Sequence, residues 1–385
     1  MTLSTLTAPT LPKRLGFFSR LLDDAPAGER YRLVTEQIAH AEAFGFDSAW
    51  VAQHHFHEHE GGLPSPFVFL AHVAARTRRI RLGTGIVTLP MENAVRVAED
   101  AIVLDLLSGG RLELGVGTGG TPESFAAFGI TSDDRSAVYA RHLALVRDAW
   151  AGRPLPGGDR LYPAAEQLLG RVWQATFSVA GGERAGQAGD GLMLSRTQPR
   201  TAEAPGAALH DLQHPIIDAY LAALPGGATP RIVGSRSLFV ADDRKEALRL
   251  ADVGLRRAAA RFAAAALQPG QAPRPGPDAP LETLIAAYDV HVGTPDDVIA
   301  TLQADTALAR ATDIVFQVHS VDPPHAHILR SIELTATRVA PALGWVRKHT
   351  GAANTTPTTA AATTTAPTPT PTTPTASSTR TEAIA

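Results

Sequence analysis

The chain has 385 residues, of which 44% are hydrophobic and 19% charged, the composition of a globular protein with a sizeable core. Its formal net charge of −3 gives no general attraction to nucleic acid or anionic membranes, and no apolar run is long enough for a membrane-spanning helix. The absence of cysteine excludes disulfides and thiol catalysis and favours a cytoplasmic location.

Strand-like and helix-like segments alternate in the N-terminal half of the chain. Residues 1–12 are rich in Thr and Pro and lack the apolar core of a signal peptide, so we expect a flexible leader. Short apolar runs predict strands at 14–19, 48–53, 79–88 and 111–117. Apolar residues at helical spacing predict helices at 29–44, 65–77, 94–107 and 136–150. This alternation indicates parallel strands joined by right-handed crossovers.

The alternation continues after residue 150 with one interruption. Further strands are expected at 172–177, 191–194, 232–240 and 313–318, and further helices at 183–188, 216–224, 242–266, 295–304 and 324–345. Residues 197–230 are rich in Pro, Ala and Gly, and we interpret them as an insertion over the mouth of a barrel. About eight strands with intervening helices predict an α/β fold, a (β/α)₈ TIM barrel with insertions. An open doubly wound sheet is the alternative, but the first strand-to-helix turn lacks its phosphate-binding glycine pattern.

The C-terminal segment has a different composition from the rest of the chain. Residues 350–385 consist mainly of Thr, Pro and Ala, with almost no large apolar side chains. Such a segment cannot bury enough apolar surface to offset the entropy of ordering. We therefore expect one folded domain at 13–349 and a disordered tail at 350–385.

A histidine-rich segment, His54 to Glu60, follows the second expected strand. It has three interpretations: a solvated loop, a metal site, or a single catalytic histidine at a barrel mouth. Imidazole and carboxylate are ligands for zinc and iron, but the spacing is not that of a helical metal motif, and an extended chain points alternate residues apart. We favour His54 as a proton donor, proton acceptor or oxyanion stabiliser, because strand ends at the mouth carry the chemistry of such barrels.

Three glycine-containing segments lie at the ends of expected strands: 83–86, 115–120 and 177–183. The first two are compatible with close approach of a ligand, but also with strands that merely contain small residues. In the third, Ser178 and free backbone N–H groups at a helix start suit a phosphate, and Ser178 also suits a plain helix cap. Two charge pairs, Arg96 with Glu99 and Asp105 with Arg111, are interpreted as structural.

Several motifs in order along the chain resemble the luciferase-like monooxygenase family. They are Phe44-Gly-Phe-Asp-Ser-Ala-Trp50, Gln53-His-His-Phe56, Leu82-Gly-Thr-Gly-Ile-Val-Thr-Leu-Pro90 and Leu106-Leu-Ser-Gly-Gly-Arg-Leu-Glu-Leu-Gly-Val-Gly117. The likeness is dense over residues 14–150, resumes at 172–196 and returns at 292–295 and in the closing helix. It implies a (β/α)₈ barrel that binds FMN, or in some branches the deazaflavin F420, at its mouth.

The resemblance also assigns roles to residues. His54 matches the catalytic histidine beside the flavin, and the Gly85–Ile86 bond matches a cis peptide bond that supports the flavin ring. Thr118 falls where bacterial luciferase carries an arginine, and Arg196 is a candidate for a further phosphate contact. The full set of cofactor-binding residues implied is Thr84, Gly85, Ile86, Gly117, Thr118, Ser178, Gly181 and Gly182, and no metal site is expected.

The chemistry implied by the resemblance is oxygenation of a small organic substrate. A separate reductase would supply reduced FMN, which reacts with O₂ to give a C4a-peroxyflavin, and the protein would be a homodimer. Three alternatives remain open: F420-dependent hydride transfer on the same barrel, a flavin-binding protein without turnover, and a metal-dependent barrel hydrolase.

Overall fold

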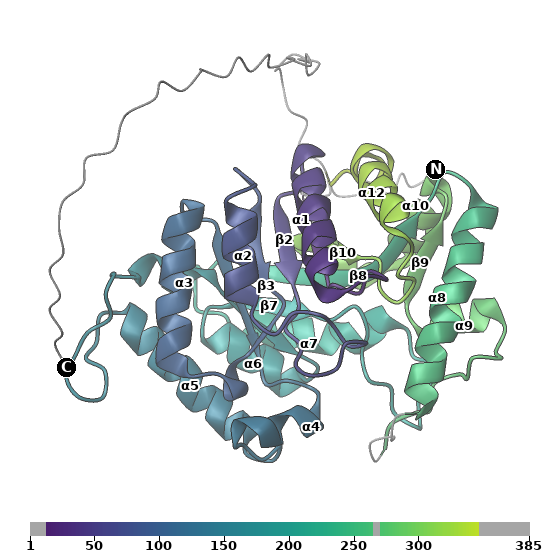
Figure 1. The fold of residues 1–385 in the computed structure, drawn as a ribbon. Helices are drawn as coiled ribbons and strands as arrows, with labels where there is room; N and C mark the ends of the chain where they lie inside the picture. The colour runs from purple at the N-terminus through teal and green to yellow at the C-terminus, as the bar shows by residue number, and fades with distance from the viewer. Residues whose placement is uncertain (1–12, 265–269, 346–385) are drawn as a thin grey trace, which may run out of the picture. The chain divides into compact units, whose positions relative to one another are not determined.

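The computed structural model describes residues 13–264 and 270–345 of the chain (Figure 1). The expected leader at 1–12 and the expected tail at 350–385 lie outside these residues. None of the helices in the described ranges is both long enough and apolar enough to cross a membrane.

The described strands form one parallel sheet that closes on itself. Its members are β1 (Arg14–Ser19), β2 (Ser48–Val51), β3 (Arg81–Thr84), β4 (Val87–Thr88), β5 (Leu112–Gly117), β6 (Val172–Thr176), β7 (Gly191–Leu194), β8 (Ile232–Val240), β9 (Val290–Gly293) and β10 (Asp313–Gln317). The order is β10-β1-β2-β3-β5-β6-β7-β8-β9, and β10 also pairs with β8, which closes the ring. Of these ten strands, β9 pairs only with the outer half of β8 and β4 continues the line of β3, so eight strand positions form the barrel. The predicted (β/α)₈ barrel is confirmed.

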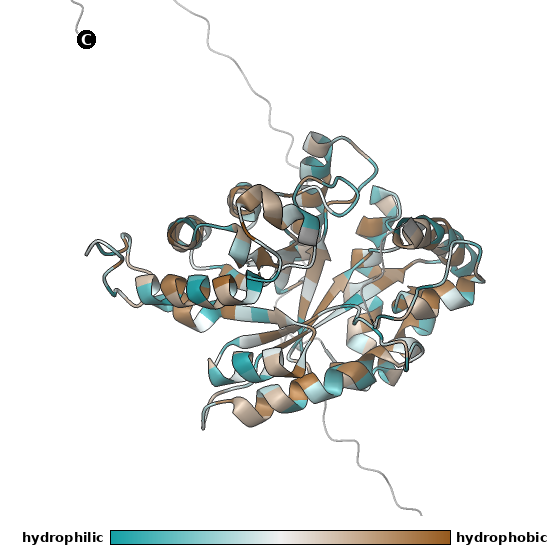
Figure 2. Cartoon of the chain, turned by 90° about the horizontal axis from the view of Figure 1, so that it is seen from below, coloured by the Kyte–Doolittle hydropathy of each residue, from teal (hydrophilic) through white to brown (hydrophobic). Residues whose placement is uncertain are grey.

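Helices surround the strands on the outside (Figures 1 and 2). The α-helices are α1 (Ala27–Ala43), α2 (Pro66–Ala74), α3 (Ala94–Ser108), α4 (Pro122–Phe125), α5 (Arg135–Trp150), α6 (Val179–Gln187), α7 (Leu209–Ala223), α8 (Arg244–Ala264), α9 (Leu281–Ala287), α10 (Pro295–Ala304), α11 (Thr306–Arg310), α12 (His325–Leu334) and α13 (Ala340–Ala342). Short 3₁₀ segments lie at η1 (Leu89–Met91), η2 (Ala126–Phe128) and η3 (Glu166–Arg171), and a π-helical turn, η4 (Thr335–Val339), joins α12 to α13. Most of these helices carry both polar and apolar residues, as the mixed colours of Figure 2 show.

Local capping signals explain several helix ends. The Asn93 side chain accepts hydrogen bonds from the first-turn amides of α3, and Gly109 ends this helix with a φ of 71°, a conformation that glycine adopts without strain. A capping box between Thr294 and Asp297 starts α10. Ser178 caps α6, so this helix begins at Val179, four residues earlier than the expected 183.

The barrel interior is filled by side chains below the mouth. Trp50 and Trp173 meet edge to face, with ring centroids 5.8 Å apart. A Cβ atom at Gly83 would lie 2.2 Å from the Trp50 ring, and one at Gly191 would lie 2.1 Å from the Trp173 ring. These glycines make room for the two indoles, so the barrel is a packed core and a ligand must bind above it.

The structure differs from the expected pairing of Asp105 with Arg111 and adds detail to residues 197–230. Asp105 does not pair with Arg111: its carboxylate lies 2.8 Å from Arg171, while Arg111 donates to the carbonyl oxygens of the α2–β3 connection and of Ser108. Residues 197–230 contain α7, which packs against α6 and forms the crossover from β7 to β8. Whether the remainder of 197–230 covers the mouth stays a prediction.

Candidate active site

Polar side chains gather where the parallel strands end. Because β1, β2, β3, β5, β6, β7, β8 and β10 are parallel and adjacent, the segments after them meet at one rim. In a barrel of this architecture that rim carries the chemistry. The structure therefore brings the three glycine-containing segments and His54 to the same end of the fold.

His54 lies three residues beyond β2, in a loop that folds back on itself. Its backbone N–H donates to the carbonyl oxygen of Leu63 (3.0 Å), which closes the loop. Its Nδ1 lies 3.7 Å from Oε2 of Glu60, and that carboxylate also accepts a hydrogen bond from the Thr121 hydroxyl (3.2 Å). A Cβ atom at Gly61 would lie 2.6 Å from the His54 ring, so glycine is needed for this ring to pack.

The protonation of His54 is set mainly by burial. Burial lowers the pKa of His54 from its ordinary value of 6.5, and the nearby Arg20 acts in the same direction, while Glu60 opposes both. The interaction with His54 in turn lowers the pKa of Glu60. His54 is therefore a neutral imidazole at neutral pH, held by an ionised carboxylate, which is the arrangement of a proton acceptor.

The other histidines of the same loop, His55, His57 and His59, make ring contacts with neighbouring side chains. His55 packs against Phe56 and Phe128, with centroid distances of 5.8 and 4.8 Å, and burial lowers its pKa. The rings of His57 and His59 lie 5.8 Å apart. Within the described ranges, no cluster of three or more His, Asp or Glu side chains is arranged to hold a metal ion.

The end of β3 has the predicted backbone and a different side-chain role. The peptide bond between Gly85 and Ile86 is cis. The Thr84 hydroxyl is buried and bridges β3 to β5, donating to the Gly115 carbonyl oxygen (2.7 Å) and accepting from the Gly115 N–H (2.9 Å). The Thr84 side chain is therefore committed to the barrel wall, and contact of this segment with a cofactor would come from Gly85 and Ile86.

The loop after β5 passes close to its neighbours. A Cβ atom at Gly117 would lie 2.9 Å from Ile86, and one at Gly119 would lie 2.6 Å from Thr88. Gly119 also has a φ of 82°, which favours glycine. Thr118 is half-buried between them. The loop is thus held against the end of β3, beside the cis peptide bond.

The segment after β6 forms the start of α6. The Ser178 hydroxyl accepts from the Gly181 N–H (3.1 Å), and residues 177–180 are exposed. The next two amides, those of Val179 and Ala180, have no acceptor within the helix. Gly181 and Gly182 are buried by contrast: a Cβ atom at these positions would lie 1.9 Å from Thr176 and 2.5 Å from the Ile216 carbonyl oxygen. These two glycines let α6 pack, and Ser178 with the two exposed amides forms the exposed N-terminal end of α6, the kind of position that suits an anion.

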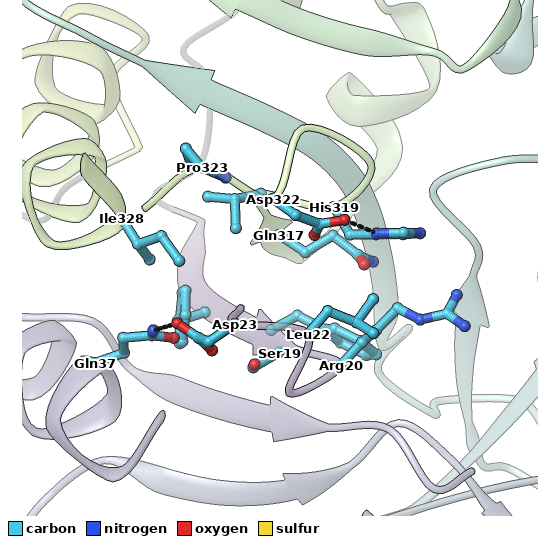
Figure 3. A pocket seen from close by; sticks show the side chains of 13 residues that line it. Ser19, Arg20, Leu22, Asp23, Gln37, Gln317, His319, Asp322, Pro323 and Ile328 are labelled. Atoms are coloured by element: carbon cyan, nitrogen blue, oxygen red, sulfur yellow. Dashed lines mark hydrogen bonds and ion pairs between the residues drawn. The ribbon is translucent and has the colours of Figure 1, made fainter. Parts of the chain in front are cut away.

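Four titratable residues at the mouth, Arg20, Glu60, His319 and Asp322, were not singled out from the sequence. Arg20 follows β1 and donates two hydrogen bonds to the Glu60 carbonyl oxygen. His319 and Asp322 follow β10, and their side chains are 2.8 Å apart. Figure 3 shows Arg20, His319 and Asp322 lining a small pocket with a volume of about 20 Å³, and the Arg20 side chain and the His319 ring point to the same side, away from Asp23. The signal in the sequence is a charged side chain directly after a strand for Arg20, a position two to five residues after a strand for His319 and Asp322, and membership of the histidine-rich loop for Glu60.

The fold and this rim define a (β/α)₈-barrel protein with its chemical groups at the C-terminal mouth. The chain belongs to the luciferase-like monooxygenase family, because the model of that family matches residues 15–312. Relatives in this family include monooxygenases, which are oxidoreductases, and the predicted family is confirmed.

Individual relatives agree with this assignment. The chain is 34% identical to 4-hydroxyprotoasukamycin monooxygenase of Streptomyces nodosus subsp. asukaensis over 54% of its own length and 58% of that protein's length. The crystal structure of monooxygenase RslO1 from Streptomyces bottropensis is 27% identical, with a TM-score of 0.68 over 86% of this chain and 99% of that chain.

More distant structures share the fold alone. The oxygenating constituent of 3,6-diketocamphane monooxygenase from Pseudomonas putida, solved in complex with FMN, is 19% identical, with a TM-score of 0.66 over 86% of this chain and 98% of its own. The F420-dependent tetrahydromethanopterin reductase of Methanopyrus kandleri is 17% identical, with a TM-score of 0.60 over 86% and 99%.

Proposed function

We propose that the protein is a flavin-dependent monooxygenase that uses reduced FMN, supplied by a separate reductase, and O₂ to oxygenate a small organic substrate. The observation that carries the proposal is the meeting of three features at one rim. They are His54 after β2, the cis Gly85–Ile86 bond after β3, and the exposed start of α6 after β6. The named monooxygenase relatives support the same reaction class.

The residues at the rim fit FMN. The exposed amides of Val179 and Ala180, with the Ser178 hydroxyl, suit the terminal phosphate, because a helix N-terminus presents free N–H groups and a positive dipole end. Gly85, Ile86, Gly117 and Thr118 would contact the ring system from β3 and β5. When bound, reduced FMN would supply the electrons for activation of O₂.

The chain's own groups would position reactants and move a proton. His54, neutral and oriented by Glu60, would accept a proton at Nε2 or stabilise a developing oxyanion. Arg20 holds the 54–63 loop in place through the Glu60 carbonyl oxygen, which keeps Glu60 against His54. The same loop would limit the access of water to the mouth.

We assign the reduction of FMN to a separate reductase because the sequence offers no sign of a dinucleotide-binding site. The first strand-to-helix turn has no glycine pattern for a dinucleotide, so NAD(P)H reduction is assigned to another protein. The cytoplasmic location inferred from the cysteine-free composition stays part of this proposal.

Titration with reduced cofactors under anaerobic conditions tests the proposal. We expect reduced FMN to bind and the subsequent admission of air to produce a transient, oxygen-dependent absorbance change in the bound flavin. Preferential binding of reduced F420 without any response to air would instead assign hydride transfer on the same barrel. Binding of neither cofactor would contradict both functions.

Homodimer formation is proposed on the basis of an exposed apolar surface. The solvent-exposed fractions are 71% for Val68 on α2, and 47%, 57% and 67% for Val103, Leu106 and Leu107 on α3. The three α3 residues have the i, i+3, i+4 spacing that places side chains on one face. Exposed apolar side chains that share one face of a helix are typical of a protein interface.

Replacement of Leu107 with glutamate is expected to dissociate the dimer, because a charge would have to be buried in the interface. The measurement is molar mass by light scattering during size-exclusion chromatography. Val253→Glu on α8, where the side chain is 57% exposed, is the matched control and should leave the mass unchanged. A monomeric wild-type protein would contradict the proposal.

A further inference from the structure

Arg196 is a buried cation without a carboxylate partner. It lies two residues beyond β7, with 7% of its surface exposed. Its Nη1 donates to the Ser237 hydroxyl on β8 (3.0 Å), and none of the described carboxylates forms an ion pair with it. Burial and the neighbouring Arg20 lower the pKa of Arg196 to about 9, so the guanidinium is still protonated at neutral pH. An unpaired buried charge is costly, and such groups are usually compensated by a ligand or a partner.

The charged groups around Arg196 do not neutralise it. Arg20 and Arg274 face it as further cations. Asp322 and Asp289 also lie near it, but the Asp322 carboxylate is 4.0 Å from the Arg257 guanidinium and Asp289 is paired with Arg200 (2.6 Å). Arg20 donates two hydrogen bonds to the backbone carbonyl oxygen of Glu60, which does not neutralise its charge. This side of the mouth therefore carries an excess of positive charge.

An unpartnered polar atom lies on the same side of the mouth as Arg196. Gln317 is the register partner of Ser237 in the β10–β8 pair, so both side chains lie on the same face of the sheet, the face that Arg196 contacts. The Gln317 carboxamide is 5% exposed, and its oxygen has no hydrogen-bond partner. Buried polar atoms without partners are uncommon, and a bound ligand is one of their ordinary explanations.

The location connects this site to the candidate active site. Arg20 donates to the carbonyl oxygen of Glu60, whose carboxylate lies 3.7 Å from His54. Arg196 follows β7 and is close enough to Arg20 for this cation to lower the pKa of Arg196, and β7 belongs to the arc of adjacent strands β7, β8, β10 and β1. The exposed N-terminal end of α6 follows β6, whereas the hydrogen bond of Arg196 is directed toward Ser237 on β8. The Arg196 site is therefore distinct from the position proposed for the FMN phosphate.

We propose that Arg196, with Arg20 beside it, binds a carboxylate of the organic substrate, so that the substrate is an organic acid whose apolar part extends toward His54. The identity of the bound molecule as a substrate rests on the proposed function, whereas the anion site itself does not. A guanidinium fork matches the planar geometry of a carboxylate. The phosphate of FMN is also an anion and is present during turnover. The test below therefore distinguishes binding of a substrate carboxylate from binding of this phosphate.

The test compares acids with their uncharged amides on the full-length chain. Benzoate and octanoate are titrated against benzamide and octanamide by calorimetry, without flavin and again with FMN. We expect at least one acid to bind about tenfold more tightly than its amide, and Arg196→Gln to abolish this preference while leaving amide affinity unchanged. Arg310→Gln, which removes an equal charge from a surface pair with Asp218, should keep the preference.

Riboflavin and FMN provide the second arm. If Arg196→Gln weakens FMN but not riboflavin, the anion bound at this site is the cofactor phosphate, and the proposal is wrong. If neither acid is preferred over its amide in the wild type, the proposal is also wrong, whatever the variants do. Arg196→Lys retains the charge and is expected to keep part of the preference. It provides a second readout if Arg196→Gln folds poorly. Failure of FMN to bind at all, with the acid preference intact, would overturn the proposed function and leave the anion site standing.

Discussion

Replacing His54 with alanine is expected to lower turnover by about a hundredfold, the usual contribution of a positioned acid or base. The affinity for reduced FMN should change little, because the cofactor phosphate is assigned to α6 and the ring to β3 and β5. The measurements are turnover under saturating flavin and, separately, the dissociation constant of the flavin. His57→Ala, on the same loop, is the control for damage to the loop. A His54→Ala enzyme with wild-type turnover would remove His54 from the mechanism.

The pH dependence gives a sharper test of the role of His54. Burial lowers the pKa of His54 below its ordinary value of 6.5, so the neutral imidazole is the major form at pH 6.5 and above. If the neutral form is required, activity rises with pH through that pKa. The Glu60 carboxylate favours the protonated ring, so Glu60→Gln should lower the pKa further and move the acidic limb of the profile to lower pH. A shift to higher pH, or none, would show that Glu60 does not act on the catalytic group.

The barrel was predictable because each element carries its own signal. The strand at 191–194 and the helix at 295–304 have the bounds expected from the apolar pattern and, for the helix, from Thr294 and Pro295 at its start. The strand β9 was missed, since it pairs only with the outer half of β8 and has a short, half-buried sequence. The start of α6 was placed too late, because the two glycines after Ser178 weaken the helical pattern, although Gly181 is required for the close approach to Thr176 and Gly182 for packing against Ile216 of α7.

The site was predictable only in part, because pairing across the mouth depends on the closure of the barrel. His54 and Ser178 stand at strand ends and can be found from the sequence. The contact of Thr84 with Gly115 cannot, because the choice between a wall residue and a ligand contact depends on which way the side chain turns. Arg196 was noted as a possible phosphate contact, but its burial and its lack of a carboxylate partner appear only when β7, β8, β10 and β1 are brought side by side.

The assignment of the FMN phosphate to α6 predicts an effect of charge at Ser178. Aspartate caps a helix as well as serine, so Ser178→Asp should preserve α6 and the melting temperature. It places a negative charge where the phosphate is expected to bind, and we expect FMN affinity to fall on the order of a hundredfold. Ser178→Ala, which removes the cap without adding charge, should instead cost about 1 kcal/mol of stability and weaken FMN much less.

Riboflavin separates the phosphate from the rest of the cofactor. It carries the same ring as FMN without the phosphate, so its affinity should be nearly equal in the wild type and in Ser178→Asp. Thr294→Asp, at the N-terminus of α10, introduces the same charge at another helix cap and should leave both flavins unaffected. Equal weakening of FMN and riboflavin by Ser178→Asp would mean that the substitution distorts the ring site. Unchanged binding of both would place the phosphate elsewhere on the rim, because a like charge at the binding end of a helix cannot be neutral toward a dianion.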